Sequence, residues 1–437
     1  MGSHLAFKQS NTGTAGVHKC AIMKTLNSFR YPEISAEALY EHFARHESDN
    51  EGREYSPETN PRLMSPLHIK AAFSPGALID NNSLAELLEN MQDDPKTALG
   101  FVRVYSNGSL SPVHESEFLY GKLADKETWR GYLYRTMGSR PFGLIINGGE
   151  KWCAPIARFA AQCLAPVVKV LGRAQTTLEA TLFVGDYGYT PFGVHVDDPY
   201  TYVVHFHVGP GSKEMTVIGR GEFEKYSRGR ESSFEPEKMI PHGVTYLIEP
   251  GDIFLLPPHL YHVGCSSDYS LGLAVAVSKY PQSIMIRRNL QAASSELDLL
   301  GLVQDKSMIS AQLSVAAWLH AINAKQSARL YSRGNLRYQP SGSQAIENVE
   351  NISWAPDPVY PIYAIPDGKT LFVYARGHEI RMINDDKVRA LVEELSKRSH
   401  TIRSLAATVA DEIELEALKT IVRQLLVLGG LRLTGKF

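Results

Sequence analysis

Residues 249–264 read Glu-Pro-Gly-Asp-Ile-Phe-Leu-Leu-Pro-Pro-His-Leu-Tyr-His-Val-Gly, and this stretch decides the fold. The Pro250-Gly-Asp turn leads into a short apolar strand, Pro257-Pro258 ends that strand, and a new strand is expected at His262. The stretch therefore predicts two consecutive strands joined by a turn, which is the kind of connection found in a jelly roll.

Short candidate strands with glycine and proline between them lie on both sides of this stretch. After Arg173 they are expected at 178–184, 202–208, 215–218, 245–248, 252–256 and 271–278. Many short strands at regular spacing indicate a sandwich or a barrel. The pattern predicts an α+β protein built on a double-stranded β-helix, or jelly roll, with flanking helices.

The rest of the chain predicts further units around this core. Residues 1–22 open with Met-Gly-Ser-His and are interpreted as a tag or disordered start. Residues 23–172 are interpreted as an N-terminal α/β part, with helices expected over 35–46, 83–91 and 154–171. The jelly-roll core spans 173–280. It is followed by a helical segment over 281–335, a linker over 336–360, and a small unit over 361–437.

The small C-terminal unit is expected to contain three helices and a β-hairpin, which is typical of a winged helix. Its acidic residues offset its lysines and arginines, so packing or protein docking is favoured over reading a DNA groove. The helical segment before it has two interpretations: it covers the barrel within one chain, or it pairs two chains in a homodimer.

Composition narrows the classes of partner. The 437 residues carry 45 Lys and Arg against 47 Asp and Glu, so no global positive field favours nucleic acid. No apolar run is long enough to predict a membrane span. Cys20, Cys153, Cys163 and Cys265 are far apart, without Cys-x-x-Cys spacing, and predict neither a zinc knuckle nor a disulfide framework. A cytoplasmic location is the simplest expectation.

Candidate metal ligands lie in two places. His195 and Asp197 alternate in Phe-Gly-Val-His-Val-Asp-Asp, so in an extended segment both side chains share one face. His262 is the preferred third ligand because it follows the turn and precedes Gly264, and His259 is its rival. Two imidazoles and one carboxylate leave a face of an iron ion open. Taken alone, His-x-Asp is better explained by a surface histidine and an exposed aspartate.

With these residues the sequence resembles the JmjC-type branch of the cupin superfamily, the Fe(II)- and 2-oxoglutarate-dependent oxygenases. Its layout is most similar to the bacterial ribosomal-protein hydroxylases. The matching stretches are His195-Val-Asp, Gly209-Pro-Gly-Ser-Lys213 and 250–264, and the resemblance covers Thr181 to Ser278.

The resemblance implies that His195, Asp197 and His262 hold Fe(II). It also implies that Lys213 pairs with the distal carboxylate of 2-oxoglutarate, and that Thr181 is a polar cosubstrate contact. The ribosomal enzymes have arginine at the basic position, and the alternative for Lys213 is a solvated lysine in a turn.

His205 and His207 share a face of the strand predicted over 202–208. They either line the pocket or face outward as ordinary polar residues, and metal ligation by them is the least expected role.

The function implied by the resemblance is hydroxylation of an unactivated carbon in a protein or peptide side chain, with consumption of O₂ and release of succinate and CO₂. Three alternatives stay open. They are a tailoring hydroxylase for an amino acid or natural-product intermediate, a non-enzymatic cupin and winged-helix regulator, and a zinc-loaded cupin with isomerase or hydrolase activity.

Overall fold

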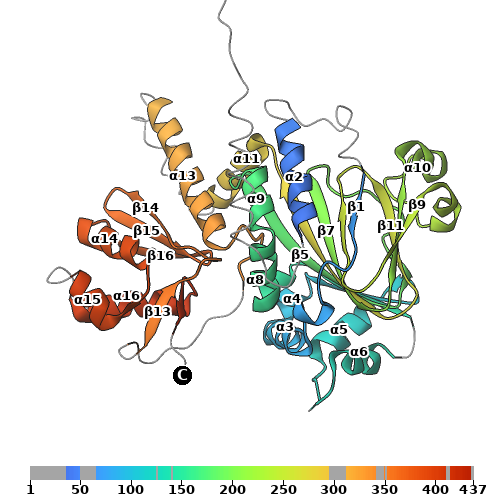
Figure 1. Ribbon diagram of the computed structural model, residues 1–437, viewed down its shortest axis with the longest axis horizontal. Helices are drawn as coiled ribbons and strands as arrows, with labels where there is room; N and C mark the ends of the chain where they lie inside the picture. Colours follow the sequence, from blue (N-terminus) through green and yellow to red (C-terminus); the bar gives the residue numbers. More distant parts are fainter. Residues whose placement is uncertain are drawn as a thin grey trace, which may run out of the picture.

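The computed structural model describes residues 36–49, 65–124, 126–138, 141–294, 312–340, 349, 352–409 and 414–434. Figure 1 shows a sheet-rich body, and beside it a smaller C-terminal body drawn in orange and red. The predicted start over 1–22 lies outside the described residues.

Two antiparallel sheets face each other in the larger body. The large sheet contains the neighbours β10 (Ile253–Leu256), β7 (Thr201–Pro210), β12 (Ser270–Lys279) and β5 (Thr176–Gly185), and the small sheet has the order β6 (Gly188–Tyr189), β11 (Tyr261–Ser266), β8 (Lys213–Ile218), β9 (Val244–Ile248). Along the chain, successive strands alternate between the sheets, except that β8 and β9 pair as neighbours. This topology is the predicted double-stranded β-helix.

Four more strands extend the large sheet at its two ends. β1 (Leu67–Ile69) pairs with β10, while β4 (Phe142–Ile146), β2 (Val102–Ser106) and β3 (Ser109–Leu110) follow β5, all antiparallel. The strands that come from the N-terminal part therefore continue the sheet of the jelly roll.

Asp252 fixes the Pro250-Gly-Asp turn. Its carboxylate accepts hydrogen bonds from the backbone N–H groups of Ala71 and Glu249, at 2.8 and 3.0 Å, and pairs with His68 at 2.8 Å. Gly251 has a φ of +94°, and a Cβ there would lie 2.5 Å from the carbonyl oxygen of Phe73. The Pro-Gly-Asp signal therefore marks a packed turn that starts β10 one residue later than predicted.

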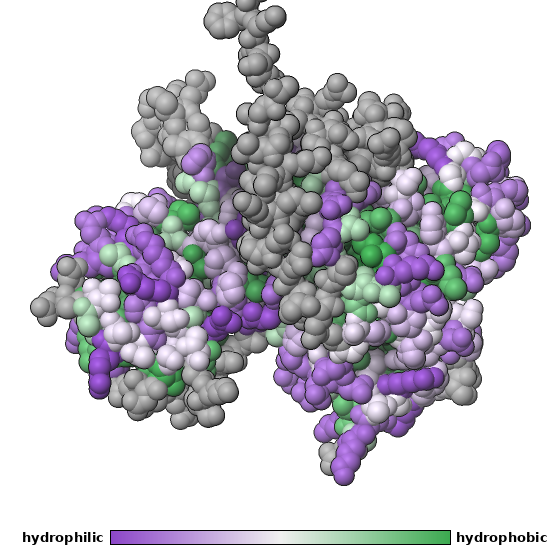
Figure 2. Space-filling model, in the orientation of Figure 1, coloured by the Kyte–Doolittle hydropathy of each residue, from purple (hydrophilic) through white to green (hydrophobic). Residues whose placement is uncertain are grey.

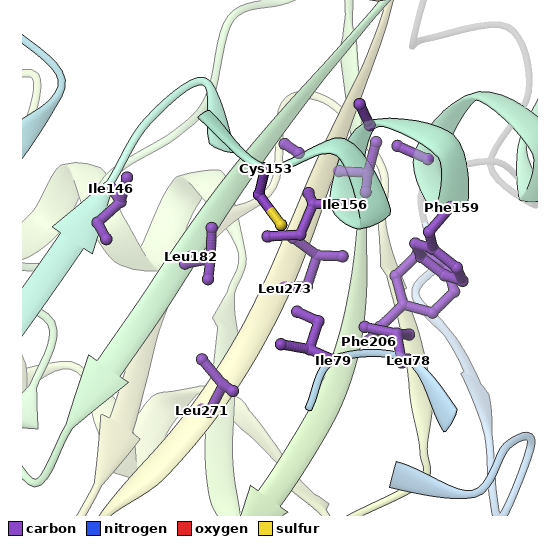
Figure 3. Packing of buried hydrophobic residues seen from close by; sticks show 14 of the residues in the cluster. Leu78, Ile79, Ile146, Cys153, Ile156, Phe159, Leu182, Phe206, Leu271 and Leu273 are labelled. Carbon is purple, nitrogen blue, oxygen red and sulfur yellow. The ribbon is translucent and has the colours of Figure 1, made fainter. Parts of the chain in front are cut away.

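Helices cover the outer face of the large sheet. They are α2 (Glu37–Asp49), α3 (Asn81–Asp93), α4 (Pro95–Ala98), α5 (Pro112–Tyr120), α6 (Trp129–Met137), α7 (Gly149–Trp152), α8 (Ala154–Cys163) and α9 (Ala165–Leu171). Figure 3 shows Ile156 and Phe159 of α8 directed at Leu182, Leu273 and Phe206 of the sheet. This layer and the sheet share one hydrophobic core.

The single helix predicted over 154–171 is wrong, because the chain bends by 50° between α8 and α9. Pro166 lies in the first turn of α9, where its missing N–H is tolerated, but it cannot continue α8. No single described helix is long and apolar enough to span a membrane; this bent pair passes that test by length and composition, and its apolar side chains are buried against the sheet.

Replacing Phe206 with Ala should destabilise the larger body by about 3–5 kcal/mol, because a fully buried aromatic ring leaves a cavity. The ring packs edge to face on Phe159, with centroids 4.9 Å apart. Denaturant unfolding monitored by circular dichroism measures the change. Leu247→Ala, at a position that is 53% exposed on β9, is the control and should change stability by less than about 0.5 kcal/mol.

The C-terminal body has a hydrophobic core of its own. Its strands are β13 (Ser353–Pro356), β14 (Tyr363–Asp367), β15 (Thr370–Ala375), β16 (His378–Ile383), β17 (His400–Thr401) and β18 (Leu431–Leu433), and its helices are α14 (Asp386–Leu395), α15 (Ile402–Thr408) and α16 (Leu415–Val427). Three helices and a hairpin are thus present, while the winged-helix assignment and the domain limits stay predictions.

Two further helices, α11 (Gln282–Ser294) and α13 (Gln312–Ser332), lie between the two bodies in Figure 1 and pack against each other. The middle of the helical segment predicted over 281–335 lies outside the described residues. On the face drawn in Figure 2, hydrophobic residues form small separate patches among hydrophilic ones.

Candidate active site

A cavity of about 310 Å³ lies between the two sheets of the jelly roll. Alternate residues of the strands line it, as expected for the inward face of a pleated strand. From the large sheet these are Glu179, Thr181, Phe183, Thr201, Val203, His205, Ala274, Ala276 and Ser278, and from the small sheet Lys213, Met215, His262 and Gly264. The central strand β12 contributes only small side chains, which leaves room for a ligand.

His195, Asp197 and His262 meet at this cavity. Asp197 Oδ1 lies 3.8 Å from His195 Nε2, and Asp197 Oδ2 lies 3.8 Å from His262 Nε2. Two backbone hydrogen bonds, of 3.1 and 2.8 Å, join the two histidines as an isolated antiparallel bridge. Among the described residues this is the only group of three potential ligands close enough to hold one metal ion, with ligand atoms within 4.8 Å of one another.

The hydrogen bonds of the two rings select Nε2 as the ligand atom. His195 Nδ1 donates to the carbonyl of Gly193 at 3.0 Å, and His262 Nδ1 donates to the carbonyl of Leu260 at 3.1 Å. A neutral ring that carries its proton on Nδ1 leaves a lone pair on Nε2. Burial lowers the pKa of His262 to about 4, so this ring is neutral at pH 7, as a metal ligand must be.

His259, the rival third ligand, takes no part in this cluster. It has a φ of +68° in the turn after Pro257-Pro258, and it does not line the cavity. The turn places β11 so that His262, three residues further on, faces the cavity.

Lys213 is buried at the inner end of the cavity, so the alternative of a solvated turn lysine is wrong. It is the first residue of β8, is 6% exposed, and its Nζ lies 4.9 Å from the ring centre of Phe183. Within the described part of the chain, no carboxylate lies within 4 Å of this amino group. A buried cation without a counter-charge is costly, so the cavity is suited to an anion.

Gly264 makes room for this lysine. A Cβ at this position would lie 2.8 Å from Lys213 Cε and 3.3 Å from its Nζ. His262 and Gly264 are two residues apart on β11, a spacing of about 6–7 Å along the strand, so the triad and the amino group lie at successive inward-facing positions of this strand. A short dicarboxylic acid has the length to join them.

Thr181 lines the cavity on β5, where its hydroxyl lies 3.4 Å from the side-chain oxygen of Asn147. Asn147 was not among the predicted site residues. It lies directly after β4 in an Asn-Gly-Gly turn, and a polar residue at the end of a buried strand is the signal that points to it.

His205 and His207 have different environments although both were expected on one face. His205 lines the cavity, in the row formed with Ala274 and Thr181 by the strand register. His207 is 2% exposed and bonds through Nε2 to the carbonyl of Gly211 at 2.6 Å. Burial lowers the pKa of His207 to about 4, and we interpret it as a structural residue of the β7–β8 turn.

The entrance of the cavity includes a residue from far along the chain. Arg337 lies just beyond α13 and pairs with Glu179 of β5, with Nη1 and Oε2 2.5 Å apart. Its segment is held on β5 by hydrogen bonds from Arg337 N to Leu178 O and from Leu178 N to Asn335 O. Local sequence patterns could not predict this, because the two segments are about 160 residues apart.

No protein-family model and no curated protein matches the chain. Among solved structures, YcfD, a ribosomal oxygenase from Escherichia coli in complex with cobalt and 2-oxoglutarate, is 15% identical, with 89% of this chain and 98% of that chain covered and a TM-score of 0.44. Its complex with cobalt and succinic acid gives 14% identity, the same coverage and the same TM-score.

The α-ketoglutarate-dependent epimerase SnoN from nogalamycin biosynthesis is 12% identical, with 55% of this chain and 84% of that chain covered and a TM-score of 0.29. Both solved structures are described as 2-oxoglutarate-dependent proteins or complexes, and both are less than 25% identical to this chain. All these TM-scores are below 0.5, so the roles of the residues rest on the geometry of the site.

Proposed function

We propose that this protein is an Fe(II)- and 2-oxoglutarate-dependent hydroxylase. The observation that carries the proposal is that the His195, Asp197 and His262 cluster opens on the same cavity as the buried Lys213. Two imidazoles and a carboxylate match the donor set of non-haem Fe(II) oxygenases. The overall reaction would consume the substrate, 2-oxoglutarate and O₂ and yield the hydroxylated substrate, succinate and CO₂.

Each residue of the site has a task in this proposal. Bound Fe(II) would supply the activation of O₂ and the oxidation chemistry. His195 and His262 would hold it through Nε2, because the backbone carbonyls of Gly193 and Leu260 fix the two rings. Lys213 would bind the distal carboxylate of 2-oxoglutarate, and Thr181 would contact the cosubstrate from β5.

The substrate we propose is a side chain of a protein or peptide. In support, the side chains of His195 and Asp197 are 22% and 29% exposed, so a group that projects from a large molecule can approach the metal position.

We further propose a cytoplasmic homodimer in which the C-terminal unit is a winged helix that docks protein. The balanced charge of the chain, 45 basic against 47 acidic residues, supports this over binding to DNA.

Anaerobic titration of the purified protein with Fe(II) and then 2-oxoglutarate tests the proposal. We expect a weak visible charge-transfer band that appears only when both are present. Zinc binding without such a band would favour the zinc-cupin alternative and contradict the oxygenase proposal.

Succinate release then separates the substrate classes. We expect peptides from digested ribosomal proteins to raise succinate release above the rate without substrate. Stimulation by free amino acids alone would contradict the macromolecular substrate and favour a tailoring hydroxylase.

A further inference from the structure

His205 is a polar residue of the cavity wall to which the proposed reaction gives no role. Among the described residues, no hydrogen bond is formed by its side chain, and its Nε2 is buried without a partner. Leaving a buried polar group of this kind without a partner destabilises the folded protein. Such a group in a folded protein requires an explanation, and a ligand in the cavity provides one.

The surroundings of His205 indicate which part of a ligand it meets. Burial is the largest of the effects that lower its pKa well below the usual value, and the charge of Lys213 is the next, ahead of that of His262. His205 is therefore a neutral ring with one N–H donor, and Lys213 is the strongest charge near it.

The strand register explains how one ligand reaches both residues. Ala274 lies between His205 and Thr181 in the large sheet, and Gly272 follows in the next inward-facing row, between His207 and Phe183. The β12 residues that line the cavity, Ala274, Ala276 and Ser278, are all small, and Lys213 of the opposite sheet lines the same cavity. An anionic group held by Lys213 therefore lies beside the imidazole of His205.

We propose that His205 is a second binding residue for the distal carboxylate of 2-oxoglutarate, donating a hydrogen bond to one oxygen while Lys213 pairs with the other. This inference rests on the proposed function. In this arrangement the cationic Lys213 and the neutral His205 bind the distal carboxylate together. The two residues therefore favour dicarboxylic keto acids over monocarboxylic ones. A residue that only packs in the cavity wall would show no such selectivity.

The test compares two keto acids on the full-length protein loaded with Mn(II) under anaerobic conditions. 2-Oxoglutarate has the distal carboxylate, whereas 2-oxopentanoate has the same chain length without it. We expect His205→Leu to weaken 2-oxoglutarate binding about 10-fold in calorimetry and to leave 2-oxopentanoate binding unchanged. His205→Gln, which keeps an N–H donor, should recover part of the loss.

A double-mutant cycle with Lys213→Met shows whether the two residues act on one group. We expect the losses to be less than additive, because both residues contact the same carboxylate. Melting temperature and Mn(II) affinity serve as controls for folding and for the metal position, and neither should change in His205→Leu.

Three outcomes would overturn the inference. An equal loss for both keto acids would place His205 at the keto-acid end or in a packing role, and an unchanged affinity for 2-oxoglutarate would exclude the contact. If the wild-type protein binds Mn(II) but not 2-oxoglutarate, the proposed function itself fails, and the inference falls with it.

Discussion

Substituting His262 with Ala should abolish stable metal binding, with a loss of affinity for Fe(II) or Mn(II) of more than about 100-fold. Loss of groups that merely orient a metal ligand already costs 10- to 100-fold, and here a ligand itself is removed. His262 is also the buried member of the cluster, at 6% exposure, and the described residues contain no second group of three ligands that could hold the ion. Turnover of 2-oxoglutarate should fall to background.

His259→Ala is the matched control for this experiment. It removes the same chemical group three residues away, in the turn where His259 has a positive φ, and it leaves the cluster intact. Metal content measured after dialysis should be unchanged in His259→Ala and lost in His262→Ala. The opposite pattern would assign the third ligand to His259 and would contradict the geometry of the site.

The preference for His262 over His259 shows how much of the site local sequence could predict. A turn signal followed by β-branched and aromatic residues indicates where a strand starts, and strand alternation then sets which side chains face inward. For His195 and Asp197 the same rule predicted a shared face. Their approach to His262 depends on pairing between segments about 65 residues apart, which the jelly-roll topology supplies.

Other parts of the molecule could not be predicted in this way. The break between α8 and α9 is due to Pro166. Apolar residues recur every three or four positions on both sides of it, so this spacing alone predicted one helix. Strand alternation predicted that His205 and His207 share one face. It could not predict that the carbonyl of Gly211, in the following turn, forms a hydrogen bond with His207 and not with His205. Arg337 reaches the entrance through a tertiary contact with β5, for which no local pattern exists.

Lys213→Met should weaken 2-oxoglutarate binding about 10- to 100-fold while metal binding is retained. A hydrogen bond to a charged group contributes about 1.5–3 kcal/mol, which is the range of this change. Methionine keeps most of the apolar volume beside Phe183 and Gly264, so the cavity should keep its shape. Steady-state succinate release at varied 2-oxoglutarate, together with anaerobic titration, measures the effect.

Lys213→Arg distinguishes charge from shape at the same position. The larger guanidinium must fit where Lys213 already packs so closely on Gly264 that a Cβ added to this glycine would lie 2.8 Å from the lysine Cε. We therefore expect Lys213→Arg to restore little of the affinity, even though the charge is retained. Full recovery in Lys213→Arg would show that charge alone matters, and full affinity in Lys213→Met would show that the distal carboxylate is bound elsewhere.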